Sequence, residues 1–227
     1  MWRKDVNHTE MSIPVIINNR DLLTWPKAMV ERISRYDGVG EIIIVDNGST
    51  YPPLLDWYKT NPCKVIYQAN LGMAAPWLCQ AVNNLKAKYY VVTDSDMGLE
   101  NTPNDTLLYL KDKLESLPHL EKVGLGLDWQ RVEDKSPYYQ RLHKYEKDRW
   151  DKSNIENGVY VDVHTDTTFA LYSKQWYFIG GGSTTFPYVA RHYPWEFSLE
   201  EARSNEEFKY YIDNATSASS YKTLINL

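Results

Sequence analysis

Residues 89–96 read Tyr-Tyr-Val-Val-Thr-Asp-Ser-Asp, an apolar run that ends in two carboxylates, Asp94 and Asp96. Aromatic and β-branched residues over so short a stretch are typical of a buried β-strand. Two acidic residues spaced two apart at the end of a strand point to the same side, so they can share a hard divalent cation such as Mg²⁺ or Mn²⁺. That cation can in turn hold a diphosphate. The alternative interpretation is that both residues are turn or helix-capping residues, as Asp often is.

Short apolar runs alternate with helical segments along the first half of the chain. Such alternation is typical of a mostly parallel sheet with right-handed crossovers and helices on both faces. Sheets of this kind bind ligands at the carboxyl ends of their strands. We therefore predict an α/β fold with a mostly parallel central sheet flanked by helices. The expected strands are 13–18, 41–46, 63–67, 89–93 and 122–128, and the expected helices are 24–36, 52–58, 74–85 and 102–117.

The second half of the chain alternates less regularly. No internal repeat or linker-like stretch marks a domain boundary there. We predict one domain over 1–227, with loose ends at 1–11 and 214–227, which is either the whole protein or one domain of a longer one. The expected elements are a helix at 136–150, strands at 160–163, 167–172 and 186–190, a glycine break at 180–182, and a last helix that begins with a capping box at Ser198 and Glu201 and ends at Ile212.

The composition excludes several classes of protein. The 227 residues are 43% hydrophobic, and 25 Lys and Arg against 30 Asp and Glu give a net charge of -5. The mean hydropathy is -0.54, and no apolar stretch approaches a membrane span, so we expect no transmembrane segment. The start of the chain lacks a signal peptide, and Cys63 and Cys79 fit neither a disulfide framework nor a zinc site, which predicts a cytoplasmic protein. The acidic balance predicts no nucleic-acid partner.

Polar residues follow each of the predicted parallel strands. The first strand ends in Asn18-Asn19-Arg20, the second in Asp46-Asn47-Gly48-Ser49-Thr50, and the third is followed by Asn70-Leu71-Gly72. Together with 93–96, in this order, these segments resemble the GT-A glycosyltransferases, particularly the inverting family 2 type. Residues 166–172, Asp-Thr-Thr-Phe-Ala-Leu-Tyr, and 191–195, Arg-His-Tyr-Pro-Trp, are similar to small bacterial and large-DNA-virus members of that group.

The resemblance implies a role for each of the polar strand ends. Asp46 would bind the nucleobase, because a carboxylate accepts a base N–H, and Asp94 would approach the ribose or the metal. Asp96 would be the direct ligand of Mn²⁺ or Mg²⁺, and His192 would complete the metal shell. Each residue has a plainer alternative as a turn, a cap, a packed side chain or a surface charge. The implied nucleotide-binding residues are Asn18, Arg20, Asp46, Asn70, Gly72 and Asp94, and the implied metal ligands are Asp96, Asp94 and His192.

The acceptor side of such an enzyme needs a general base. An inverting transfer requires a carboxylate that takes the proton from the acceptor hydroxyl. Asp166, at the head of a predicted strand, is the first candidate; Glu196 is the second and Asp162 the third. The usual Glu-Asp pair of the family before a late helix is not plainly present, so inversion and the identity of the base both stay open.

The sequence thus predicts a metal-dependent glycosyltransferase. It would move a sugar from a UDP- or GDP-linked donor to a hydroxyl of a glycan or glycoconjugate. A sugar-nucleotide pyrophosphorylase is one alternative, although residues 18–23 lack the glycines of its phosphate loop. A non-catalytic carbohydrate-binding module is another, because aromatic residues make up 14% of the chain and can stack on sugars, although they also pack protein cores.

Overall fold

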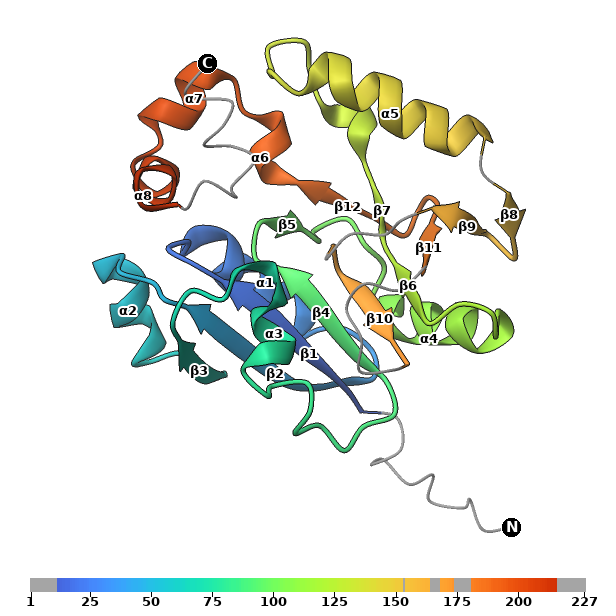
Figure 1. Ribbon diagram of the computed structural model, residues 1–227, viewed down its shortest axis with the longest axis horizontal. Coiled ribbons are helices and arrows are strands. Elements are labelled where there is room, and N and C mark those ends of the chain that lie inside the picture. Colours follow the sequence, from blue (N-terminus) through green and yellow to red (C-terminus); the bar gives the residue numbers. More distant parts are fainter. Residues whose placement is uncertain (1–11, 153, 164–167, 174–180, 216–227) are drawn as a thin grey trace.

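The computed structural model describes residues 12–152, 154–163, 168–173 and 181–215. A nine-stranded sheet, in the order β3-β2-β1-β4-β10-β6-β11-β9-β8, runs through the molecule (Figure 1). A second sheet of three short strands, in the order β5-β12-β7, lies beside it. The structure is therefore α/β, with a large central sheet flanked by helices, as the sequence predicts.

The first half of the chain forms the parallel part of the large sheet. β1 pairs in parallel with β2 and with β4, and β2 pairs in parallel with β3. The register sets Asn18 opposite Asp94 and Asn19 opposite Asp46, so the carboxyl ends of these strands are level. The strands are β1 (Ile13–Asn19), β2 (Val39–Asn47), β3 (Lys64–Gln68) and β4 (Tyr90–Asp94), and the helices are α1 (Thr24–Ile33), α2 (Pro52–Tyr58), α3 (Ala75–Leu78) and α4 (Thr106–Ser116), with a short 3₁₀ turn, η1 (Gly72–Ala74).

Alternation along β1 builds two cores, one on each face of the sheet. Ile13, Val15 and Ile17 pack with residues of α1, α2 and α4, whereas Ile16 packs on the other face with Trp77 of α3. Successive side chains of a strand point to opposite faces, and all four of these isoleucine and valine residues are buried. The central strand therefore supports both layers of helices.

The second half of the chain extends the sheet with strands of both directions. β10 (Ala170–Tyr172) is antiparallel to β4 and to β6 (Lys122–Gly124), and β11 (Gly181–Thr184) is parallel to β6. The parallel part of the predicted, mostly parallel sheet thus extends from β3 to β4, and the pairing is mixed beyond β4. The remaining elements are β8 (Ile155–Glu156), β9 (Val159–Val163), η2 (Trp129–Arg131), α5 (Tyr139–Lys152), α6 (Tyr193–Glu196), α7 (Leu199–Ser204) and α8 (Glu206–Asn214).

The three-stranded sheet lies where the two halves meet. β12 (Val189–His192) is antiparallel to β5 (Met97–Gly98) and parallel to β7 (Gly126–Leu127). The predicted strand 122–128 is therefore divided, because β6 stays in the large sheet and β7 joins the small one. A third core cluster, which includes Leu22, Trp129 and Phe208, joins the helices of the second half to the end of β1.

Several local predictions were wrong, each for a clear reason. The helix predicted at 74–85 ends at Leu78, because Gln80 adopts a left-handed φ of 66°. Gly181 and Gly182 belong to a buried strand instead of a break, since side chains of neighbouring strands leave no room for a Cβ there. The last helix is two helices, α7 and α8, that meet at the extended Asn205. The Ser198–Glu201 capping box forms as predicted.

In the described ranges, no helix is both long and apolar enough to cross a membrane. The predicted loose ends fall largely outside the description: 1–11 and 216–227 lie outside the described residues, whereas Asn214 is the last residue of α8.

Candidate functional site

Asp46 is held firmly at the end of β2. It is 3% exposed, and its Oδ2 accepts a hydrogen bond from the backbone N–H of Ser49 at 3.1 Å. Its Oδ1 is buried without a hydrogen-bond partner in the described part of the chain. Burial first, and then the Asp46 carboxylate, raise the pKa of the neighbouring Tyr58 hydroxyl, which accepts from Asn19 Nδ2 at 2.8 Å. Asp46 is thus a buried carboxylate held in place at the end of β2, and its oxygens suit a partner that supplies an N–H.

A loop after β3 is fastened to the ends of β1 and β2. The side chain of Asn47 accepts from the Leu71 N–H at 2.7 Å and donates to the Gly72 carbonyl at 2.9 Å. Asn18 Nδ2 lies 3.4 Å from the same carbonyl, and Asn70 Oδ1 accepts from the Gly72 N–H at 3.0 Å. The structure therefore brings the predicted Asn18, Asn70 and Gly72 together. Asn47, to which the sequence analysis gives no role, is the residue that joins them.

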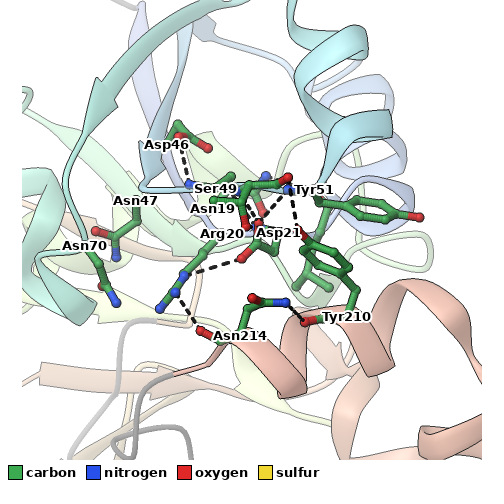
Figure 2. A network of polar contacts seen from close by, with 12 residues as sticks. Asn19, Arg20, Asp21, Asp46, Asn47, Ser49, Tyr51, Asn70, Tyr210 and Asn214 are labelled. Carbon is green, nitrogen blue, oxygen red and sulfur yellow. Dashed lines mark hydrogen bonds and ion pairs between the residues drawn. The ribbon is translucent and has the colours of Figure 1, made fainter.

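Arg20 links the end of β1 to the last described helix. Its Nη2 donates to the Asn214 carbonyl of α8 at 2.7 Å, and its Nε lies 3.5 Å from Asp21 Oδ2 (Figure 2). Asp21 is fully buried in a left-handed conformation with φ of 51°, and its Oδ1 accepts from the backbone N–H groups of Thr50 and Tyr51. Asp21 therefore organises the turn after β2, a role that sequence reasoning missed.

Tyr210 of α8 belongs to the same hydrogen-bond network. Figure 2 shows Tyr210 and Asn214 reaching from α8 toward the loop that carries Arg20 and Asp21. The Tyr210 hydroxyl donates to the Thr50 carbonyl at 3.1 Å, and its ring lies 5.0 Å from that of Tyr51. A helix distant in sequence thus forms one wall beside the carboxyl ends of β1 and β2.

The second acidic residue of the Asp-Ser-Asp segment meets His192. Because β5 and β12 pair antiparallel, His192 lies opposite Met97, next to Asp96. His192 Nε2 is 3.6 Å from Asp96 Oδ2, and the Tyr193 N–H donates to the Asp96 carbonyl at 3.1 Å. The centroid of the Trp195 ring lies 4.5 Å from that of the His192 imidazole, and this packing restricts the position of the imidazole. Asp94 ends β4, precedes Asp96 by two residues and is half-buried.

Two atoms of this pair are available for a ligand. Asp96 Oδ1 and His192 Nδ1 are buried, and neither has a hydrogen-bond partner among the described residues. A carboxylate oxygen and an imidazole nitrogen are suitable ligands for Mn²⁺, and Mg²⁺ takes carboxylates. No group of three or more His, Cys, Asp or Glu that could hold a metal is found within the described ranges. Any cation held by this pair would have to take its other ligands from phosphate oxygens and water.

The structure describes the three candidate bases to different extents. Glu196 accepts hydrogen bonds from Arg191 with both of its oxygens, one of them from Nε at 2.8 Å. Asp166 lies outside the described residues, as does His164, and the side chain of Asp162 is likewise not described. A cavity of about 240 Å³ is lined by Arg32, Met97 and Tyr193 among others; none of the predicted site residues lines it, although Met97 and Tyr193 are the chain neighbours of Asp96 and His192.

The comparisons with known proteins identify the fold. No protein-family model matches the sequence, and no curated protein matches it. Mannosyltransferase PcManGT from Pyrobaculum calidifontis, in complex with GDP-Man and Mn²⁺, matches with a TM-score of 0.50 and 16% identity over 88% of this chain and 59% of its own. Glucosyl-3-phosphoglycerate synthase from Mycobacterium tuberculosis, with Mn²⁺, UDP-glucose and phosphoglyceric acid, matches with a TM-score of 0.44 and 16% identity over 76% and 62%. Staphylococcus aureus TarS residues 1–349 match with a TM-score of 0.45 and 13% identity over 94% and 69%.

The likeness to the mannosyltransferase carries the conclusion about fold. This chain has the GT-A type of fold that nucleotide-sugar transferases use, as the strand-end motifs indicate. It spans about three fifths of the mannosyltransferase chain.

Proposed function

We propose that this chain is a metal-dependent glycosyltransferase that moves a sugar from a nucleoside-diphosphate sugar to a hydroxyl of a glycan or glycoconjugate. The observation that carries the proposal is the pairing of Asp96 with His192, each with a buried ligand atom unused, at the sheet edge that also holds Asp46. The mannosyltransferase that shares the fold was solved with GDP-Man and Mn²⁺, which supports the same class of donor and metal here.

The chain's own residues would divide the binding of the donor. Asp46 would accept an N–H of the nucleobase through Oδ1, because Oδ2 is already engaged by Ser49. Asn18, Asn70 and Gly72 would line the nucleotide through the loop after β3, and Arg20 would lie beside them at the end of β1. Asp94 would approach the ribose or the metal from the end of β4.

Asp96 and His192 would hold Mn²⁺ or Mg²⁺, with Asp94 as a further ligand. The cation would neutralise the charge that develops on the departing diphosphate. The acceptor hydroxyl oxygen would attack the anomeric carbon as the bond from that carbon to the diphosphate oxygen breaks. Asp166 would take the hydroxyl proton, and this single displacement would invert the configuration at the anomeric carbon. Glu196 is less suited to this task, since Arg191 occupies both of its oxygens. One domain over 1–227 and a cytoplasmic location also stay predictions.

Calorimetry with UDP and GDP, each with Mn²⁺, with Mg²⁺ and with EDTA, tests the proposal. We expect one of the nucleotides to bind with a clear dependence on metal. Asp96→Asn should weaken the metal-dependent binding of the nucleotide. Loss of a supporting residue of a metal site typically costs ~10–100-fold in affinity, and we expect at least that much here. Asp112→Asn is the matched control, because Asp112 is an exposed residue of α4 whose side chain is 71% accessible.

Three results would contradict the proposal, two of them from matching titrations with other ligands. Binding of free sugars without any nucleotide would favour a carbohydrate-binding module. Tight binding of a nucleoside triphosphate, with release of pyrophosphate on addition of a sugar phosphate, would favour a pyrophosphorylase. Metal-dependent nucleotide binding that Asp96→Asn leaves intact would remove the metal site from Asp96.

A further inference from the structure

Arg191 lies between two carboxylates that come from different segments of the chain. Its Nε and Nη2 donate to the two oxygens of Glu196, and its Nη1 donates to Glu100. The Tyr193 hydroxyl donates to the other Glu100 oxygen at 3.0 Å. A fork-to-fork contact between guanidinium and carboxylate fixes direction as well as distance, which a lysine cannot do.

The charged forms of Arg191 and of its two carboxylate partners stabilise one another. The hydrogen bond to Glu196 is the largest cause that raises the pKa of Arg191. Burial alone raises the pKa of the Glu100 carboxyl, but hydrogen bonds from its own backbone N–H and from Arg191 outweigh it and hold that pKa below its usual value. The side chains of Arg191 and Glu196 are only 26% and 21% accessible, so solvent screens their pairing less than it screens a pair on the open surface.

The cluster joins the two segments that carry the proposed metal pair. Glu100 follows Asp96 by four residues, and Glu196 follows His192 by four. Arg191, which precedes His192, lies opposite Gly98 in the β5–β12 register. Through its two carboxylate partners it therefore fastens the segment after Asp96 to the segment after His192.

Close packing at Gly98 shows how tightly these segments meet. A Cβ on Gly98 would lie 2.8 Å from Tyr193 Cζ, 2.9 Å from Glu100 Oε2 and 3.0 Å from Arg191 Cβ. A side chain at this position would have to displace the ends of the Tyr193 and Glu100 side chains, so β5 and β12 meet closely here. The placement of His192 beside Asp96 thus rests on a glycine contact and on the bridge that Arg191 makes.

We propose that Arg191 is a positioning residue for the metal-binding pair of Asp96 and His192, and that Glu196 completes this bridge instead of serving as the general base. The inference rests on the proposed function. Arg191 would act through geometry: it holds the β5 and β12 segments at the separation that lets a carboxylate and an imidazole face one cation. Loss of residues that orient metal ligands typically weakens metal binding by ~10–100-fold.

Mn²⁺ titration of the full chain in the presence of UDP or GDP, followed by the electron paramagnetic resonance signal of free Mn²⁺, measures this effect without turnover. Arg191→Gln should weaken Mn²⁺ binding by at least about tenfold, and Arg191→Lys nearly as much because it keeps the charge but loses the fork. Nucleotide binding in EDTA should stay at the wild-type level in both variants, which a general loss of structure would not allow. Arg131→Gln is the control, since Arg131 makes a comparable contact to Asp128 at 2.9 Å on the exposed surface.

Wild-type Mn²⁺ affinity in folded Arg191→Gln and Arg191→Lys would overturn this inference and leave the proposed function in place. The absence of Mn²⁺ binding in the wild-type protein would overturn both. If the Arg191 variants fail to fold, the isosteric Glu196→Gln decides the question: we expect weaker Mn²⁺ binding. Lost turnover with wild-type Mn²⁺ affinity in that variant would instead make Glu196 the general base.

Discussion

The two halves of the chain build the candidate site in different ways. In the first half, Asn18, Asp46 and Asp94 each lie within one residue of the end of a strand. Their three strands are adjacent and parallel, so local sequence and strand register place them together. In the second half, His192 reaches Asp96 only because β12 pairs with a two-residue strand, β5, almost a hundred residues earlier in the sequence. The convergence of residues at the ends of parallel strands can therefore be predicted from sequence, whereas contacts between distant segments depend on long-range pairing.

The difference has a physical cause in how the strands are stabilised. β1 is buried on both faces by branched apolar side chains, and such runs are typical of central strands in a parallel sheet. The strands of the second half are two to five residues long, and several rely on glycines for close backbone approach. A short strand that contains glycines carries little hydrophobic pattern by which the sequence could identify it.

Gly126→Ala tests this reliance on close approach and should have the largest effect on stability. A Cβ at position 126 would lie 2.2 Å from the Thr184 carbonyl oxygen, a backbone atom that cannot rotate away. We expect a loss of about 1–3 kcal/mol in the free energy of unfolding, the range for overpacking a filled site, measured by urea denaturation. Because β7 pairs with β12, which contains the proposed metal ligand His192, Mn²⁺ binding should weaken as well.

Gly72→Ala is the comparison variant in the first half. Gly72 has φ of 68°, but nothing lies within 4 Å of a Cβ built there. Its replacement should therefore cost only the backbone strain, about 1 kcal/mol. An equal or smaller loss in Gly126→Ala would mean that the second half accommodates side chains as easily as the first, and the contrast between the halves would fail.

The same contrast explains what the sequence could and could not predict. The parallel strands and their polar ends were predicted because periodicity and turn residues are local signals. The roles of Asp21 and Asn47 were missed, because their hydrogen bonds reach loops about 25 to 30 residues away and leave no trace in spacing. His192 was predicted from family resemblance alone, and nothing in its own segment indicates that β12 pairs with β5.

The boundary errors have the same origin. Residues 74–85 are apolar enough for a helix, but Gln80 turns left-handed, which the pattern does not encode. Glycines 181 and 182 are typical of a flexible break in isolation, and only the close approach of Lys122 and Val159 shows that a strand requires them. Tertiary contacts override local preference at each of these points.

Glu207 tests whether α8 belongs structurally to the first half, and the expected effect is intermediate. Its carboxylate accepts from the Leu23 N–H at 2.8 Å, the Thr24 N–H at 2.9 Å and the Thr24 hydroxyl at 2.7 Å, at the start of α1. Glu207→Gln removes the charge and part of this acceptor capacity, so we expect a loss of about 1–2 kcal/mol by urea denaturation. Glu206→Gln, in the same first turn of α8 but exposed, is the control and should be nearly neutral. Equal effects in the two variants would show that α8 is held only by its own packing.

Glu201 offers the smallest effect and the one confined to the second half, because its partners Ser198 and Lys135 both lie there. The hydrogen bond from the Ser198 backbone N–H, followed by that from Lys135, lowers the pKa of Glu201 from its usual 4.5 to about 2. A carboxylate whose pKa is lower in the folded state stabilises the fold fully above its usual pKa and loses that contribution as the pH falls toward the folded value. Glu201→Gln should therefore be less stable than wild type at pH 6, and the difference should shrink between pH 4.5 and the acid limit of folding. Glu200→Gln, in the same turn but without the capping contact, should show no such trend. Since a backbone hydrogen bond is the main cause, high salt should leave most of the difference in place; its disappearance in salt would assign the effect to Lys135 instead.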